Sequence, residues 1–269
     1  MRICIKIGTA LISRGNRLNY RWLKGKVREI AALQKRGNEI VIVSSGAVAA
    51  GMEIAGRTVR PTKTLELQMM SGMGQIRLMK YYKDYFKSEG IHVAQILLTH
   101  HNFATSNEEA TIREIMESYI GAGIIPIVNE NDMINKEEVE FQPVFTDNDI
   151  LAALVAVRIE AELLLILTDV DGLYQGNPKR DRQAKFVEEV ELIDRRIEQM
   201  AAKESNPLGL GGMASKVQAA KMVASHGIDT IVANGRYSVE QILGRKVTST
   251  LFRAGCPVLR SPGGGGHSL

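Results

Sequence analysis

Long hydrophobic runs, cysteines and aromatic residues are all scarce in this sequence of 269 residues. No apolar run approaches the roughly 18–20 residues that a membrane helix needs. The amino terminus, MRICIKIGTALIS, alternates like a strand and lacks the continuous apolar core of a signal peptide. These absences argue against a membrane protein and against a secreted one, and they favour a cytoplasmic protein.

Metal sites and disulfides are disfavoured by the spacing of the residues that could form them. Cys4 and Cys256 lie near opposite ends of the chain without a CxxC pattern, which indicates reduced structural thiols. His100-His101 has no third ligand at a suitable spacing, so we interpret it as a surface pair. Asp169–Gly172 is interpreted as a turn rather than a calcium loop, because Arg180 stands where the distal Glu is needed.

Neither the net charge nor the aromatic content indicates a nucleic-acid partner. The 34 basic residues barely outnumber the 30 acidic ones, and the basic clusters are short. Aromatic residues make up 5% of the chain and leave little surface on which bases could stack. Hydrophobic residues at 45% and charged residues at 24% are ordinary values for a globular protein. We therefore expect a folded protein that does not bind nucleic acid.

Short apolar runs alternate with helical patterns along the chain. Strands are expected at Arg2–Ile7, Glu39–Val43, His92–Leu98, Ile124–Val128, Leu163–Leu167, Thr230–Ala233 and Thr248–Phe252. Helices are expected at about Tyr20–Arg36, Thr64–Lys87 with an interruption at Ser71–Gly74, Asn107–Ile120, Ile150–Val155, Glu191–Ala201, Ala214–His226 and Val239–Leu243. This alternation predicts an α/β fold with a mostly parallel sheet and helices on both faces. One domain is expected over residues 1–255, followed by a flexible glycine-rich tail over residues 256–269.

The stretch Phe145–Tyr174 is the centre of this arrangement. It begins with the acidic turn Thr146–Asp149, continues as a helix, and ends in a buried strand that breaks into Thr168–Gly172. Polar groups at the carboxyl end of such a strand lie where open α/β sheets bind ligands. A capping box explains Thr146 and part of Asp149, but two carboxylates this close to one helix start still need cations or donors.

Two lysines are the candidate cations. Lys6 lies in an apolar strand, opposite Ile3, Ile5 and Ile7; taken alone it is a solvent-facing lysine, but a parallel sheet is covered on both faces. Lys216 follows the glycine-rich stretch NPLGLGGMASK in the first turn of a helix, where a cation opposes the helix dipole by about 0.3–1 kcal/mol. A phosphate bound at this helix start would make the lysine favourable there, because the amides and the lysine could share it. Without a phosphate, Lys216 is interpreted as an incidental exposed lysine. The stretch does not match a Walker A loop.

Seven ordered motifs make a more specific argument. They are IKIGTALIS, IVSSGAVAAG, QILLTHHNF, GIIPIVNENDMI, TDNDILAALVA, LLLILTDVDGLY and GLGGMASKVQAA. Together, from Arg2 to about Phe252, they resemble the amino acid kinase family, and within it the glutamate 5-kinase branch. The resemblance implies a three-layer α/β/α sandwich and ATP-dependent phosphorylation of the γ-carboxylate of L-glutamate to L-glutamyl 5-phosphate, the first step of proline biosynthesis. It also implies Mg²⁺, a homo-oligomer and glutamyl phosphate reductase as a partner.

The resemblance also assigns roles to matching positions. The catalytic group is Lys6, Asp149 and Lys216, with the aspartate orienting the two lysines. Glutamate is held by Ser45, Asp132 and Asn148. The nucleotide is held by Lys6, Thr168, Asp169, Leu210, Gly211, Gly212, Met213, Ala214, Ser215 and Lys216. No protein residue is assigned to the metal, since Mg²⁺ is held mainly by phosphate oxygens.

The sequence departs from the family pattern in four places. Leu210 replaces the threonine of a Gly-Thr-Gly-Gly loop, and Thr146 stands where a glycine is common. The segment HHNFATSNEEATIRE replaces an Arg-rich one, which leaves the rim of the glutamate site and proline inhibition open. A carboxyl-terminal PUA domain is not expected in this chain. The alternatives are a related kinase with another acceptor and a catalytically silent sensor; the presence of both lysines and Asp149 argues against the sensor.

Overall fold

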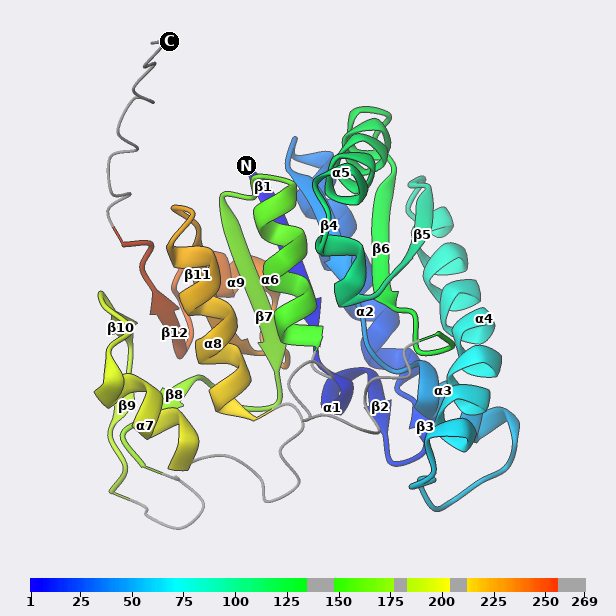
Figure 1. Ribbon diagram of the computed structural model, residues 1–269, viewed down its shortest axis with the longest axis horizontal. Helices are drawn as coiled ribbons and strands as arrows, with labels where there is room; N and C mark the ends of the chain where they lie inside the picture. The colour runs from blue at the N-terminus through cyan, green and yellow to red at the C-terminus, as the bar shows by residue number, and fades with distance from the viewer. Residues whose placement is uncertain (135–147, 177–182, 204–211, 256–269) are drawn as a thin grey trace, which may run out of the picture.

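The computed structural model describes residues 1–134, 148–176, 183–203 and 212–255 (Figure 1). Its strands are β1 (Arg2–Ile7), β2 (Ser13–Arg14), β3 (Arg17–Leu18), β4 (Glu39–Val43), β5 (Val93–Leu98), β6 (Ile125–Glu130), β7 (Leu163–Thr168), β8 (Leu173–Tyr174), β9 (Phe186–Val187), β10 (Glu189–Val190), β11 (Asp229–Asn234) and β12 (Ser249–Phe252). Its helices are α1 (Thr9–Ile12), α2 (Tyr20–Lys35), α3 (Ala47–Ile54), α4 (Thr64–Ser88), η1 (His100–Phe103), α5 (Ser106–Gly121), α6 (Asn148–Arg158), α7 (Arg195–Lys203), α8 (Met213–Ala224) and α9 (Val239–Leu243).

Eight strands form one sheet in the order β10-β12-β11-β7-β1-β4-β6-β5. Neighbouring strands run parallel except β11 and β12, which are antiparallel. The apolar runs of β1, β4 and β7 are buried because both faces of the sheet are covered. The predicted α/β fold with a mostly parallel sheet is therefore confirmed.

Alternate residues of β1 enter two separate hydrophobic cores. Ile3, Ile5 and Ile7 pack with α2, α4 and α9 on one face. Cys4 packs with α5, α6 and α8 on the other, which is the nearer face in Figure 1. Lys6 shares this second face with Cys4, and its side chain is buried. The predicted three layers are present, and the solvent-facing alternative for Lys6 is excluded.

The predicted interruption of α4 at Ser71–Gly74 is wrong, because the helix is continuous from Thr64 to Ser88. The glycines instead allow α3 and α4 to approach closely. A Cβ at Gly74 would lie 1.8 Å from the carbonyl oxygen of Ala47, and one at Gly51 would lie 1.8 Å from that of Met70. The sequence signal was real, but its cause is helix packing rather than a break in the helix.

Several short elements were not expected, and one helix begins late. The β2–β3 hairpin and α1 follow β1 directly, while α7 begins at Arg195 rather than at Glu191. The helix-start residues Thr146 and Asp147 and the tail over residues 256–269 lie outside the described residues. The domain over residues 1–255 stays a prediction. In the described part of the chain, no helix combines the length and the apolar character of a membrane span.

Candidate active site

One buried carboxylate joins the two predicted lysines. Asp149 is fully buried; its Oδ1 lies 2.5 Å from Lys6 Nζ, and its Oδ2 lies 2.9 Å from Lys216 Nζ. Both lysines are themselves almost fully buried. Three residues that are far apart in the sequence thus form one ion cluster, as the charge argument predicted.

The fold places these residues at the carboxyl edge of the sheet. Lys6 lies near the end of β1, in register with Val43 of β4 and Ile166 of β7. Asp149 lies in the first turn of α6, and Lys216 lies in the first turn of α8. Strand ends and helix starts meet at this edge in a parallel sheet, so the site lies where such sheets bind ligands.

The charges of the cluster depend on one another. Burial alone would raise the pKa of Asp149, but the charges and hydrogen bonds of Lys6 and Lys216 hold it well below its usual range. Asp149 is therefore ionised at neutral pH, and the two ammonium groups are held next to one negative charge. The cluster carries a net positive charge that suits an anion.

Ser215 gives Asp149 a third donor. Its Oγ lies 2.9 Å from Asp149 Oδ2 and 2.8 Å from the carbonyl oxygen of Gly212, and its single proton can be donated to either acceptor. Gly212 is the N-cap of α8 and supplies no side chain to cap it. Of the predicted nucleotide loop, Gly212 to Lys216 are described, whereas Leu210 and Gly211 lie outside the described residues.

A second polar group adjoins the ion cluster. Asn148 Nδ2 donates to Ser45 Oγ at 2.9 Å and to the carbonyl oxygen of Ser44 at 2.8 Å. Ser44 and Ser45 follow β4 in a turn whose Gly46 has φ +100°, a conformation that favours glycine. The structure thus brings the predicted pair Ser45 and Asn148 together, one residue from Asp149.

Sequence reasoning missed the residue that extends this group. Asn129, at the end of β6, accepts from Asn148 Nδ2 at 3.3 Å and donates from its own Nδ2 to Gln75 Oε1 of α4 at 2.9 Å. Its position in the motif GIIPIVNENDMI was the available signal, but the pattern alone did not single it out.

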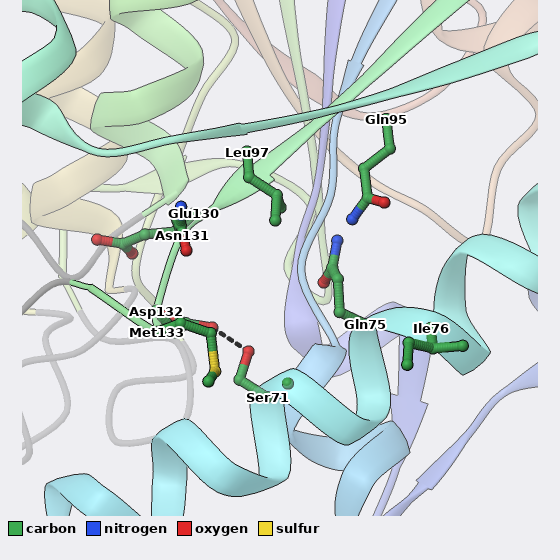
Figure 2. A pocket seen from close by; sticks show the side chains of 10 residues that line it. Ser71, Gln75, Ile76, Gln95, Leu97, Glu130, Asn131, Asp132 and Met133 are labelled. Carbon is green, nitrogen blue, oxygen red and sulfur yellow. Dashed lines mark hydrogen bonds between the residues drawn. The ribbon is translucent and has the colours of Figure 1, made fainter.

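Asp132 lines a pocket between α4, β5 and the end of β6, and neither Ser45 nor Asn148 is among the residues that line it (Figure 2). The pocket has a volume of about 240 Å³. Asp132 accepts a hydrogen bond from Ser71 Oγ of α4, and burial raises the pKa of its carboxyl group despite that bond and the charge of Arg60.

The predicted nucleotide residues of β7 lie at the same sheet edge. Thr168 is buried and pairs with Asn234 of β11, while Asp169 is exposed. Gly8 lies beside them: its N–H donates to the carbonyl oxygen of Leu167, and a Cβ on it would lie 3.0 Å from that oxygen. Among the described residues, no group of three His, Cys, Asp or Glu side chains could hold a metal ion.

Comparison with known proteins gives the family. A family model described as "Amino acid kinase family" matches residues 1–234. The chain belongs to the amino acid kinase family. Two solved structures share the fold of this family member at 17% identity: an isopentenyl phosphate kinase with a TM-score of 0.62, covering 94% of this chain and 100% of that one, and a UMP kinase from Ureaplasma parvum with a TM-score of 0.61, covering 94% and 98%.

Closer relatives of this amino acid kinase family member carry the name glutamate 5-kinase. The protein from Marinomonas sp. (strain MWYL1) is 41% identical over 87% of this chain and 62% of its own length. The protein from Nitrosomonas eutropha is 42% identical over 91% of this chain and 64% of its own length. The chain therefore spans slightly less than two thirds of these curated relatives.

Proposed function

We propose that the protein transfers the γ-phosphoryl group of ATP to the γ-carboxylate of L-glutamate, giving ADP and L-glutamyl 5-phosphate, the first step of proline biosynthesis. The observation that best supports this proposal is that the ammonium groups of Lys6 and Lys216 both form ion pairs with the buried Asp149. The relatives named glutamate 5-kinase, at about 40% identity, support the choice of acceptor.

The chemistry needs little more than positioning and charge. A carboxylate oxygen attacks the γ-phosphorus, the bond from that phosphorus to the bridging oxygen of ADP breaks, and the electron pair leaves with ADP. Because the carboxylate is already ionised, no general base is required, and catalysis reduces to alignment and neutralisation of charge. We assign the neutralisation to Lys6 and Lys216, and to Asp149 the task of fixing both ammonium groups.

The described residues fit ATP. Lys216 is a buried cation at the amino end of α8, where it opposes the helix dipole, and an anion bound there would offset that cost. We therefore assign Gly212 to Lys216 to the phosphates, and Thr168 and Asp169 to the nucleoside side of the site. Leu210 and Gly211 are predicted to continue the loop.

The site also fits Mg²⁺ held mainly by phosphates. Mg²⁺ usually keeps several waters and takes only one or two protein carboxylates, so the phosphate oxygens of ATP would be its main ligands. When bound, the ion would neutralise charge on the β- and γ-phosphate oxygens.

We assign the acceptor to Ser45, Asn148 and Asp132. Asn148 precedes Asp149, bonds Ser45 through Nδ2, and keeps a buried Oδ1 that lacks a hydrogen-bond partner among the described residues. Asp132 supplies a carboxylate for the ammonium group of the amino acid. A homo-oligomer, glutamyl phosphate reductase as a partner and a cytoplasmic location remain predictions from the family resemblance.

A hydroxylamine trap tests the proposal. Acyl phosphates react with hydroxylamine to give hydroxamates, so protein with ATP, Mg²⁺ and L-glutamate is expected to yield γ-glutamyl hydroxamate. Product with a different acid but not with glutamate would establish a related kinase instead. Nucleotide binding without turnover of any acceptor would establish a sensor.

A further inference from the structure

Gln75 presents an unused hydrogen-bond donor to the pocket that contains Asp132. The side chain, on α4, is only 8% exposed and lines the pocket. Its Oε1 accepts from Asn129, but its Nε2 is buried and has no hydrogen-bond partner among the residues that the structure describes. Buried donors are almost always paired in folded proteins, so this amide requires an acceptor that the described chain does not supply.

The orientation of the Gln75 amide follows from its neighbours. The backbone N–H of Glu130 can only donate, and it donates to Asn129 Oδ1 at 3.0 Å. Asn129 Oδ1 is thereby fixed as the acceptor and Nδ2 as the donor, which requires Gln75 to accept through Oε1. Reversing the Gln75 amide would oppose two donors, so Nε2 is the atom that faces the pocket.

The two ends of the pocket differ in charge and hydrogen-bonding character. At one end lies the Asp132 carboxylate, bonded to Ser71. At the other, Figure 2 shows the amide nitrogen of Gln75 turned toward the side-chain amide of Gln95, which projects from β5. The Gln75 donor is complementary to an acceptor, the Gln95 amide can turn its own nitrogen toward the same point, and a carboxylate provides two acceptor oxygens. The pocket therefore matches a group with an ammonium at one side and a carboxylate at the other.

A continuous hydrogen-bond chain links this pocket to the ion cluster. It runs from Gln75 through Asn129 to Asn148, and Asn148 adjoins Asp149. In a substrate that bridges the two sites, the α-amino acid group would lie in the pocket and the side-chain carboxylate would lie at Lys6 and Lys216.

Resting on the proposed function, we propose that Gln75 determines substrate specificity by donating from Nε2 to the α-carboxylate of L-glutamate. Gln95 is the second donor to the same carboxylate, and Asp132 accepts from the α-ammonium group. Recognition of both α-substituents selects an amino acid over a simple dicarboxylic acid or a simple amine. Without the α-carboxylate the buried Gln75 amide has no acceptor, and without the ammonium group the Asp132 carboxylate has no counter-charge.

The test compares glutamate with 4-aminobutanoate, which keeps the ammonium and the reacting carboxylate but lacks the α-carboxylate. Gln75→Glu keeps an acceptor for Asn129 and replaces the donor by a second oxygen. At pH 8, we expect this change to raise KM for glutamate at least about tenfold through loss of a charge-assisted bond and repulsion, with KM for ATP unchanged. Affinity for 4-aminobutanoate, measured by NMR titration, is expected to be unchanged or tighter.

Two further variants separate recognition from folding. Gln199→Glu introduces the same charge at an exposed position of α7 and serves as the matched control, with no expected effect on either ligand. Gln95→Leu removes the second donor, which lies at an exposed position of β5, and leaves the contact with Asn129 intact. It is expected to weaken the binding of glutamate about threefold and to leave the affinity for 4-aminobutanoate unchanged.

Three outcomes are decisive. If Gln75→Glu weakens the binding of glutamate but not that of 4-aminobutanoate, the assignment is supported. If Gln75→Glu weakens the binding of both ligands equally, or does not weaken the binding of glutamate, the assignment is overturned even if the hydroxamate assay with glutamate succeeds. Failure of that assay with the unmodified protein would instead reject the proposed function itself.

Discussion

Lys216 is held in place at the residue scale by groups from two helices. Its Nζ lies 2.9 Å from Asp149 Oδ2 of α6 and donates to the carbonyl oxygen of Gly212, the N-cap of its own helix, at 3.4 Å. A flexible lysine would lose conformational entropy on contacting a phosphoryl group. These contacts already order the Lys216 side chain, so that loss is smaller. In the proposed reaction, Lys216 would therefore contribute through its ordered position as well as through its charge.

Lys216→Ala tests this role. We expect kcat to fall by a factor of about 10²–10³, as when one group that stabilises transition-state charge is removed elsewhere. Lys221→Ala is the matched control, because Lys221 lies on the same helix but is exposed and pairs with Glu198. The variants would be compared by coupled ADP release, with circular dichroism to verify folding. An unchanged kcat in Lys216→Ala would contradict the assignment.

The part of the candidate site that could be predicted from the sequence is the clustering of charged residues from ordered motifs. Lys6, Lys216 and Asp149 could be predicted because buried charges need partners and the motifs fixed their order. Gln75 could not, since its significance depends on Asn129 lying opposite it, and no pattern along one helix reports a contact with another strand.

At the scale of secondary-structure elements, the crossing of α3 and α4 determines how α4 is placed relative to the turn that precedes α3. Gly51 and Gly74 let the two helix backbones touch, and Ser44 of the turn before α3 bonds the buried Tyr82 hydroxyl of α4 at 2.9 Å. This crossing fixes α4 against the turn that carries Ser45, and thereby fixes where Gln75 and Ser71 enter the pocket.

Gly74→Ala is expected to force the helices apart, because its Cβ would lie 1.8 Å from the carbonyl oxygen of Ala47. We predict a loss of about 3 kcal/mol in the free energy of unfolding, at the upper end of overpacking effects. The control is Gly25→Ala in α2, which has open space around it and should gain about 0.5–1 kcal/mol from helix propensity. Urea denaturation would measure both, and equal effects would exclude the packing explanation.

Element positions were largely predictable, because the apolar periods of 2 and of 3.6 residues survive in the sequence. The strands β1 and β4 have the predicted bounds. The failures have a physical origin: a glycine that relieves a clash with another helix looks the same in sequence as one that ends a helix. Two-residue strands such as β2 and β3 are too short to show any period at all.

The ion cluster is also a feature of the whole molecule, because it ties the central strand to two helices of one layer. Lys6, Asp149 and Lys216 belong to β1, α6 and α8, and all three side chains are buried. Breaking a buried ion cluster by removing one partner is far more costly than losing an exposed pair, since the remaining charges stay in a poor solvent.

Asp149→Asn should therefore lower the free energy of unfolding by about 3–5 kcal/mol at pH 7. Because the folded-state pKa of Asp149 is depressed, its contribution is fully present above the unfolded-state value of about 3.9 and is lost as the pH falls toward the folded-state pKa. The difference in the free energy of unfolding between the unmodified protein and Asp149→Asn should thus shrink below about pH 4.

Urea unfolding at pH 7, 4 and 3 measures this difference, with Asp84→Asn as the control. Asp84 forms an exposed pair with Lys80, so its loss should leave the free energy of unfolding nearly unchanged. A difference between the unmodified protein and Asp149→Asn that is independent of pH down to pH 3 would mean that the carboxylate charge is not what stabilises the cluster.

The central position of β1 matters while the chain is being made. Its two neighbours in the sheet are β4, which follows soon after it, and β7, which is synthesised much later. On the ribosome, one side of this strand has no pairing partner until β7 has emerged, and the ion cluster of Lys6 and Asp149 gains its third member, Lys216, only after α8 has followed. Early arrest of translation would therefore release a half-built sheet with an open edge, and such a fragment should depend on chaperones more than the finished protein does.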